Sequence, residues 1–302
     1  MKKTRMGLIA LALVLALAVS GVLLAASAAE NTKVPNTKET VWGTTVSSNE
    51  KGAIDTSNVA EGYISATYTG NCASVRVQIT KDGGETYTYT LSSPGQAEVF
   101  PLSEGSGSYT VRIYEGSGPS SNYYLAYGAT VTAKLRDELL PYLYPNQFVD
   151  YTPSSQIVSK AVEITAGKQA DLDKLTAIYN YVVDNIAYDY DLANTVQSGY
   201  VPHLDSVLSS KKGICFDYAS VMCAMLRSQH IPAKMIFGYA GNIYHAWIDV
   251  YIESQGWIQK AIYFDGTTWK LMDPTFASTS KSKGKIAPYV PDTTVYSAKY
   301  VY

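Results

Sequence analysis

Between residues 61 and 135, short runs of β-branched and aromatic residues alternate with turn residues, and no helical period of three to four residues interrupts them. Runs of this kind predict β-strands. Asp82-Gly83-Gly84 falls between two of the runs and is typical of a hairpin turn. The regular spacing predicts a small all-β antiparallel sandwich of about six or seven strands. The expected strands are 63–68, 75–80, 86–90, 98–100, 109–114 and 123–135.

The pattern changes after residue 139, where Pro141, Pro145 and Pro153 punctuate the chain. Apolar residues then recur at intervals of three and four, which predicts helices. The stretch 186–204 looks irregular, with a short turn at 203–206. Pro232 ends the last helix and strand-like runs follow, so this half is predicted to be α+β. The expected helices are 156–163, 171–185 and 214–229, and the expected strands are 233–239, 243–253, 256–265 and 269–272.

The N-terminus has the order of a secretory signal. Lys2, Lys3 and Arg5 precede an apolar run over residues 6–26, and Ala26-Ser27-Ala28 forms a cleavage site of small residues. We expect cleavage near Ala28 and a secreted or cell-surface protein. The apolar run is close to membrane-spanning length, so an uncleaved anchor is the alternative.

These patterns divide the chain into four parts. We expect a signal peptide over 1–28, a linker or loose arm over 29–58, a β-sandwich domain over 59–136 and a second, α+β domain over 137–302. The tail after Ser280 is rich in Lys, Ser and Tyr, and it fits either a final strand or a loose end.

Charge and cysteine content narrow the function. The net charge is −2 and no basic stripe is present, which argues against a nucleic-acid partner. The sequence lacks a CxxC motif and any Cys/His pair at zinc-ligand spacing, so we expect neither a metal nor a cofactor. Three cysteines leave at least one unpaired thiol in an exported protein. Whether Cys72 pairs with Cys223 stays open at this point.

Cys215 is the strongest candidate for chemistry. Gly213 breaks the chain and a helix-compatible stretch follows at once, so Cys215 is expected at a helix N-terminus. Free N–H groups and the helix dipole stabilise a thiolate there. A buried structural cysteine is the alternative. Cys223 lies inside the same predicted helix among apolar residues, and we interpret it as part of the core.

His245 and Asp273 are the candidate partners. His245 lies on a predicted strand and shares a face with Trp247 and Asp249. Asp249 is four residues away, roughly 13 Å along the strand, which is too far for a hydrogen bond to His245. Asp273 ends a later strand that we expect beside the His245 strand, where it could hold the imidazole. Taken alone, its position before Pro274 indicates only a turn.

The ordered motifs resemble the core of the transglutaminase-like superfamily. The runs that carry the resemblance are AVEITAGKQADLDKLTAIYNYVVDNIAYD, GICFDYASVMCAMLRSQHIPAKMIFGY, YHAWIDVY and WKLMDPTF, within roughly residues 150–280. The resemblance implies a papain-like α+β fold and a catalytic triad of Cys215, His245 and Asp273. The expected β-sandwich lies outside it.

The implied chemistry is acyl transfer on a protein or peptide substrate, as in a cysteine peptidase, an amidase or a crosslinking transglutaminase. Fold analogy slightly favours hydrolysis. The Cys215 N–H is the expected oxyanion donor, with Tyr200 and Trp247 as weaker candidates for a second donor. The alternative is a catalytically inactive cell-surface or cell-wall binding module, which the content of 26 Tyr against 6 Phe would suit.

Overall fold

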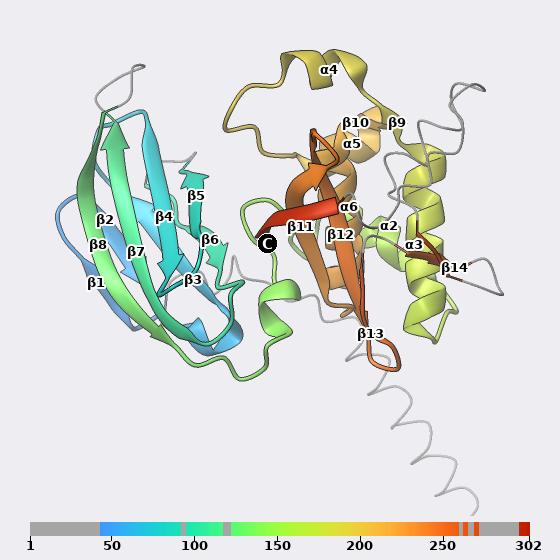
Figure 1. Ribbon diagram of the computed structural model, residues 1–302, viewed down its shortest axis with the longest axis horizontal. Coiled ribbons are helices and arrows are strands. Elements are labelled where there is room, and N and C mark those ends of the chain that lie inside the picture. Colours follow the sequence, from blue (N-terminus) through green and yellow to red (C-terminus); the bar gives the residue numbers. More distant parts are fainter. Residues whose placement is uncertain (1–42, 92–94, 117–121, 260–261, 265–268, 272–295) are drawn as a thin grey trace, which may run out of the picture. The chain divides into compact units, whose positions relative to one another are not determined.

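The computed structural model describes residues 43–91, 95–116, 122–259, 262–264, 269–271 and 296–302. The predicted signal peptide, the first part of the predicted linker and Asp273 lie outside these ranges. In the described part, strands come first, and helices with a second set of strands follow (Figure 1). The α+β prediction is confirmed. No helix in these ranges is long and apolar enough to cross a membrane.

Eight strands form two four-stranded antiparallel sheets over residues 46–133, which we call the N-terminal sheet region. Their orders are β1-β2-β3-β6 and β5-β4-β7-β8. All six predicted strands are present. The bounds are β1 Val46–Ser48, β2 Gly52–Asp55, β3 Tyr63–Tyr68, β4 Val75–Lys81, β5 Thr86–Thr90, β6 Glu98–Pro101, β7 Gly107–Gly116 and β8 Tyr123–Ala133. A 3-10 turn, η1 Val59–Glu61, precedes β3.

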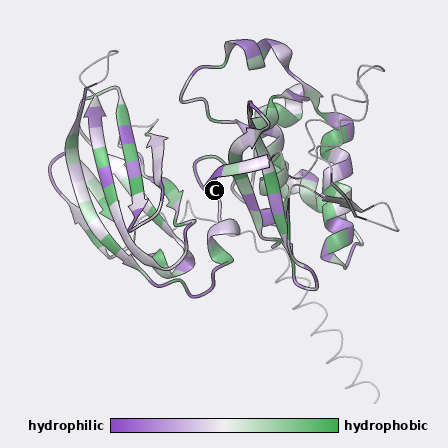
Figure 2. Cartoon of the chain, viewed as in Figure 1, coloured by the Kyte–Doolittle hydropathy of each residue, from purple (hydrophilic) through white to green (hydrophobic). Residues whose placement is uncertain are grey.

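The two sheets bury one face each. In β4, Val75, Val77 and Ile79 are buried while Arg76 and Gln78 are half-buried on the other face, and Figure 2 shows this alternation as bands of opposite hydropathy along the strands. Alternation of this kind fixes which face joins the core. At Gly52 of β2, an added Cβ would lie 2.9 Å from Ile113 of β7, so the two sheets approach closely there.

The predicted linker over 29–58 is wrong for residues 46–55, which form β1 and β2. These strands are three and four residues long, too short to show a period in the sequence. β2 is nevertheless fully buried because it pairs with β3. Their stability therefore comes from the sheet and not from a local pattern.

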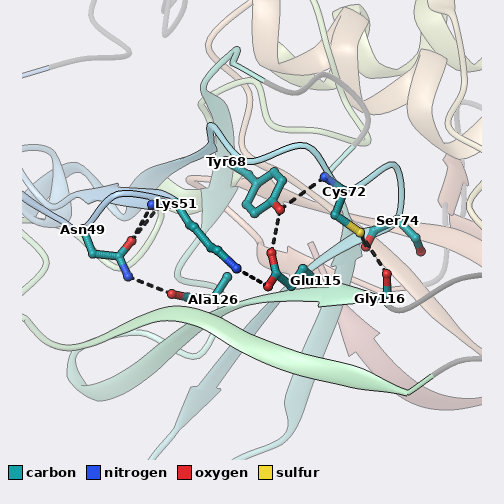
Figure 3. A network of polar contacts seen from close by, with 9 residues as sticks. Asn49, Lys51, Tyr68, Cys72, Ser74, Glu115, Gly116 and Ala126 are labelled. Atoms are coloured by element: carbon teal, nitrogen blue, oxygen red, sulfur yellow. Dashed lines mark hydrogen bonds and ion pairs between the residues drawn. The ribbon is translucent and has the colours of Figure 1, made fainter.

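Cys72 lies in a polar network at the end of these sheets (Figure 3). Its sulfur lies 2.9 Å from the main-chain oxygen of Gly116 and 3.3 Å from that of Ser74, and its one hydrogen can be donated to either. Beside it the Tyr68 hydroxyl donates to Glu115 at 2.7 Å, and Lys51 forms an ion pair with the same carboxylate. All three cysteines are free thiols, so the pairing of Cys72 with Cys223 does not form.

Helices and a second sheet make up the rest of the described chain. The four-stranded antiparallel sheet has the order β13-β12-β11-β16, and helix α6 packs on β11 and β12 (Figure 1). The tail therefore ends in a strand. The bounds are η2 Leu140–Tyr142, α2 Gln156–Thr165, α3 Asp171–Asn185, β9 Ala187–Tyr188, α4 Tyr190–Thr195, α5 Leu204–Ser210, β10 Lys212–Gly213, α6 Cys215–Ser228, β11 Ala233–Ala240, β12 Ile243–Ile252, β13 Gly256–Ile258, β14 Ile262–Phe264, β15 Trp269–Leu271 and β16 Tyr296–Val301.

The stretch predicted to be irregular, 186–204, contains β9 and α4. β9 has two residues and pairs in parallel with β10, which lies more than twenty residues later in the chain. A long-range pairing of this kind leaves no local signal. α4 has six residues, and Asp189 caps it by accepting the N–H of Leu192 at 2.9 Å. The aspartate before a short polar helix was the available sequence cue.

Candidate active site

Cys215 is the first residue of α6 and is partly exposed. Gly213 belongs to β10, where it pairs with Tyr188, and Ile214 is extended (φ −93°, ψ 179°), so the helix begins abruptly after the strand. The Asp217 carboxylate turns back and accepts the Ile214 N–H at 2.7 Å. This bond caps the first turn in the manner of an acid at the third helical position. The predicted position of Cys215 at a helix N-terminus is therefore confirmed.

A buried acid supports this helix start. Asp217 is fully buried, and its second oxygen accepts the hydroxyl hydrogen of Tyr200 at 2.7 Å. Burial raises the pKa of Asp217, and the hydrogen bonds from Ile214 and Tyr200 only partly offset that rise. The hydroxyl of Tyr200, a candidate oxyanion donor, is thus occupied by Asp217. The aspartate two residues after the cysteine was the sequence cue for this pair.

His245 lies in β12 and is 5% exposed. It pairs with Gly238 of β11, and alternation places it on the same face as Trp247. Its ring is 6.4 Å from the Tyr296 ring, and the Trp247 ring is 5.0 Å from that same tyrosine. An added Cβ at Gly238 would lie 2.7 Å from Trp247, so only glycine leaves room for the indole. Trp247 is buried in this packing rather than set beside Cys215 as an exposed donor.

The opposite face of β11 and β12 meets α6. Ser220 donates to the Met235 sulfur at 3.4 Å, and the Phe216 and Phe237 rings lie 4.8 Å apart. Tyr244 belongs to this face by register. Its pKa is raised mainly by burial, with smaller electrostatic contributions from Tyr300, Tyr239 and the Cys215 thiol. Tyr244 therefore lies on the face of β12 that meets α6, and His245 lies on the other face.

The strand before Asp273 does not take the predicted place. β15 pairs with β14 in a separate two-stranded sheet, whereas β12 has β11 and β13 as its neighbours. The strand predicted over 256–265 contains β13 and β14, and β13 pairs with β12 only at residues 250–252, away from His245. The expectation that β15 lies beside the His245 strand is therefore wrong, and Asp273 itself lies outside the described residues.

Cys223, His203 and His230 lie at positions that do not suggest a catalytic role. Cys223 is fully buried in α6, and burial raises the pKa of its thiol to about 12, which leaves it protonated and inert. His203 precedes α5. His230 follows α6 with φ +60°, and burial lowers its pKa. Within the described ranges, no group of three or more His, Cys, Asp or Glu side chains is arranged to hold a metal ion.

Comparison with known proteins adds the following relatives. The family model described as "Transglutaminase-like superfamily" matches residues 158–274. The uncharacterized protein YebA of Bacillus subtilis is 26% identical over 166 residues, which are 45% of this chain and 22% of YebA. The chain thus spans under a quarter of that relative.

Solved structures with a similarity include a proposed cysteine protease from Cytophaga hutchinsonii, at 15% identity and a TM-score of 0.36, covering 86% of this chain and 82% of that one. Red sea bream transglutaminase is 14% identical with a TM-score of 0.29, covering 70% of this chain and 48% of that one. The family match contains both Cys215 and His245 and reaches the Asp273 position. Residues 158–274 of this chain therefore match the model of the transglutaminase-like superfamily.

Proposed function

We propose that this chain is an exported cysteine enzyme that transfers acyl groups from peptide or side-chain amides. Cys215 is its nucleophile, His245 its general base, and Asp273 the residue that orients the imidazole. The position of Cys215 carries the proposal, because this thiol is partly exposed at the first residue of α6 while Cys223 in the same helix is buried. N–H groups of the first helical turn favour a thiolate at that position.

The reaction follows from these groups. The Cys215 thiolate attacks the amide carbonyl carbon, and the carbonyl oxygen becomes an oxyanion facing the N–H groups at the start of α6. His245 delivers a proton to the departing nitrogen as the carbon–nitrogen bond breaks. Water or an amine then attacks the acyl-enzyme, losing its proton to His245, and the thiolate is released.

The role of His245 places one demand on β12. Helix α6 packs on β12, and the Cys215 thiol makes a small electrostatic contribution to the raised pKa of Tyr244, the residue before His245. Neighbouring residues of a strand point to opposite faces, and a bulge at the beginning of a strand redirects a side chain. The pairing of β11 with β12 is regular from Ala233↔Val250 to Ala240↔Ile243, so the proposed role of His245 requires a local rearrangement of β12 that turns the imidazole toward the thiol.

Thiol labelling tests the proposal directly. The purified protein is treated with iodoacetamide across pH, and the labelled cysteine is identified by mass spectrometry. We expect Cys215 to react fast well below about pH 8, the range of an ordinary thiol. His245→Ala should abolish this reactivity at low pH, whereas Tyr244→Phe, the matched control on the same strand, should retain it. Cys223 serves as the internal reference for an inert thiol.

The opposite result is equally clear. If Cys215 reacts no faster than an ordinary thiol and neither variant changes its rate, the enzyme proposal fails. The chain would then be better explained as an inactive surface-binding module. Loss of reactivity in Tyr244→Phe but not in His245→Ala would assign the activating role to the phenol and overturn the triad.

Two finer points belong to this proposal. Export is tested by expressing the full chain and sequencing the N-terminus of the protein in the medium, where Ala29 is the expected first residue. Hydrolysis is distinguished from amine transfer by incubating a glutamine-containing peptide with a fluorescent primary amine. Released ammonia without incorporated amine indicates an amidase, and incorporated amine indicates a transglutaminase.

A further inference from the structure

A pocket of about 310 Å³ lies beside the first turn of α6. One wall is Phe216, the residue directly after Cys215, together with Phe148 and the loop 198–201. The other wall comes from the N-terminal sheet region, which contributes Arg76, Thr88 and Thr90. Consecutive helix residues are separated by about 1.5 Å along the axis. The pocket therefore begins one residue after the proposed nucleophile, although Cys215 itself is not among the residues that line it.

The apolar side of the pocket is held firmly in place. The Phe216 ring is 5.4 Å from Phe148, 6.1 Å from Tyr200 and 4.8 Å from Phe237. Tyr200 is fixed in turn by its hydrogen bond to buried Asp217. These contacts give the pocket a preformed aromatic side.

Arg76 is the charged residue in the pocket lining. Its Nε donates to the Tyr123 hydroxyl at 3.2 Å, and its Nη1 donates to the Thr90 hydroxyl. Both partners are neutral. In the part of the chain that the structure describes, no carboxylate forms an ion pair with Arg76. The guanidinium is thus oriented by hydroxyl groups without a counter-ion, and N–H donors remain for a ligand.

A guanidinium presents its donors in a planar fork that matches a carboxylate. Resting on the proposed function, we propose that this pocket binds a carboxylate of the peptide substrate through Arg76. The N-terminal sheet region then sets part of the substrate specificity of the Cys215 enzyme. The carboxylate is that of an acidic side chain or of a peptide C-terminus, and the pocket volume suits one or two residues.

Binding to the Cys215→Ala protein tests this without requiring turnover. Fluorescein-labelled peptides that contain a glutamine are compared by fluorescence polarisation. The first peptide carries Glu near that glutamine, and the second carries Gln in place of the Glu. The third peptide has the sequence of the second and a free C-terminal carboxylate. All other termini are blocked, and the charged residue is scanned over three positions on each side. We expect at least one carboxylate peptide to bind about tenfold more tightly than its neutral counterpart. The peptide that gains identifies the source of the carboxylate.

Substitutions of Arg76 test whether the preference for a carboxylate comes from this residue. Arg76→Gln should remove the preference, because it keeps an uncharged amide where the Nε donates to Tyr123 but lacks the guanidinium fork, and Arg76→Lys should keep part of it. The control is Arg112→Gln, because Arg112 is exposed and pairs with Gln78 on the same outer face of the sheet, outside the pocket lining. This control should leave the preference unchanged. Circular dichroism confirms that each variant is folded.

The outcomes separate this inference from the proposed function. Equal affinity for all peptides, or a carboxylate preference that survives Arg76→Gln, would overturn the pocket assignment even if Cys215 labels rapidly and turns over substrate. A preference that depends on Arg76 in a protein whose Cys215 is unreactive would retain the pocket as a binding site and reject the enzyme.

Discussion

Asp217 shows how one residue can connect a helix start with a loop. Its carboxylate joins the Ile214 N–H to the Tyr200 hydroxyl, although it is fully buried. A buried acid without an ion pair costs free energy when it is charged, and its hydrogen bonds only partly offset that cost. The geometry of the nucleophile thus depends on a group whose charge is unfavourable, and this gives the protein a specific pH dependence.

We expect the stability of the protein to fall, relative to Asp217→Asn, as pH rises from about 4. The folded pKa of Asp217 is raised above the ordinary value of 3.8, so the folded state holds its proton over a range where the unfolded state has lost it. Stability then decreases with pH between the two pKa values, by up to about 1.4 kcal/mol per pH unit. Urea unfolding of both proteins between pH 4 and about 7 measures the difference.

The direction in which the stability difference between the two proteins changes with pH shows whether burial dominates the pKa of Asp217. The amide in the Asp217→Asn variant has no proton to lose, so the gap between the two proteins isolates the titration of this carboxyl. A gap that is constant with pH, or that moves in favour of the wild-type protein as pH rises, would show that burial does not dominate the environment of Asp217.

At the scale of elements, helix α6 is hydrogen-bonded through one buried side chain to three other segments of the chain. Arg227 near its C-terminal end is fully buried and donates to the main-chain oxygens of Ala233, Tyr144 and Tyr302. One side chain thereby connects α6 to β11, to the segment before α2 and to the residue after β16. Because those segments are far apart in sequence, this connection acts on the tertiary fold rather than on the helix alone.

Arg227→Met should therefore destabilise the protein by at least about 2 kcal/mol. The apolar side chain fills similar space but leaves buried carbonyl groups with fewer donors, at about 1–3 kcal/mol for each unsatisfied group. Thermal and urea unfolding measure the loss. The exposed Arg112→Met is the matched control and should change stability by no more than about 0.5 kcal/mol. Equal effects of the two substitutions would contradict a structural role for Arg227.

Elements also show how far the sequence predicts the structure. Helix α3 matches its predicted bounds because a clear helical period specifies it, and β3 and β5 match theirs because runs of aromatic and β-branched residues specify them. β1, β2 and β9 escape prediction because only long-range pairing stabilises such short strands. At the site, the place of Cys215 follows from a glycine and a helix pattern. The side of β12 that faces α6, and the separation of β15 from β12, depend on strand pairing that no local pattern encodes.

At the scale of the whole molecule, the C-terminal residues connect the second sheet to the N-terminal sheet region. Tyr302 is 5% exposed, and its ring is 5.4 Å from Tyr87 and 5.8 Å from Tyr89. The Val301 N–H donates to the Tyr87 hydroxyl at 3.4 Å, and burial raises the pKa of Tyr87 to about 12. Gln147 also donates to the Thr90 carbonyl at 2.6 Å, beside the pocket assigned to the substrate. Tyr302 also contacts Phe148 of the pocket lining, with ring centroids 4.9 Å apart, so the packing of these tyrosines supports that side of the pocket.

A double-mutant cycle on Tyr87 and Tyr302 measures this connection. Each change to Ala should cost about 3 kcal/mol because a buried aromatic ring is removed. The double variant should lose less than the sum, by about 0.5–1.5 kcal/mol, because the perpendicular contact between the rings is counted in both single variants. Tyr124, which is 58% exposed, provides the control pair with Tyr302, and this pair should be additive within about 0.5 kcal/mol. Additivity of Tyr87 and Tyr302 would mean that the two regions do not stabilise each other through these rings, and the Arg76 pocket would then lack the support on which its shape depends.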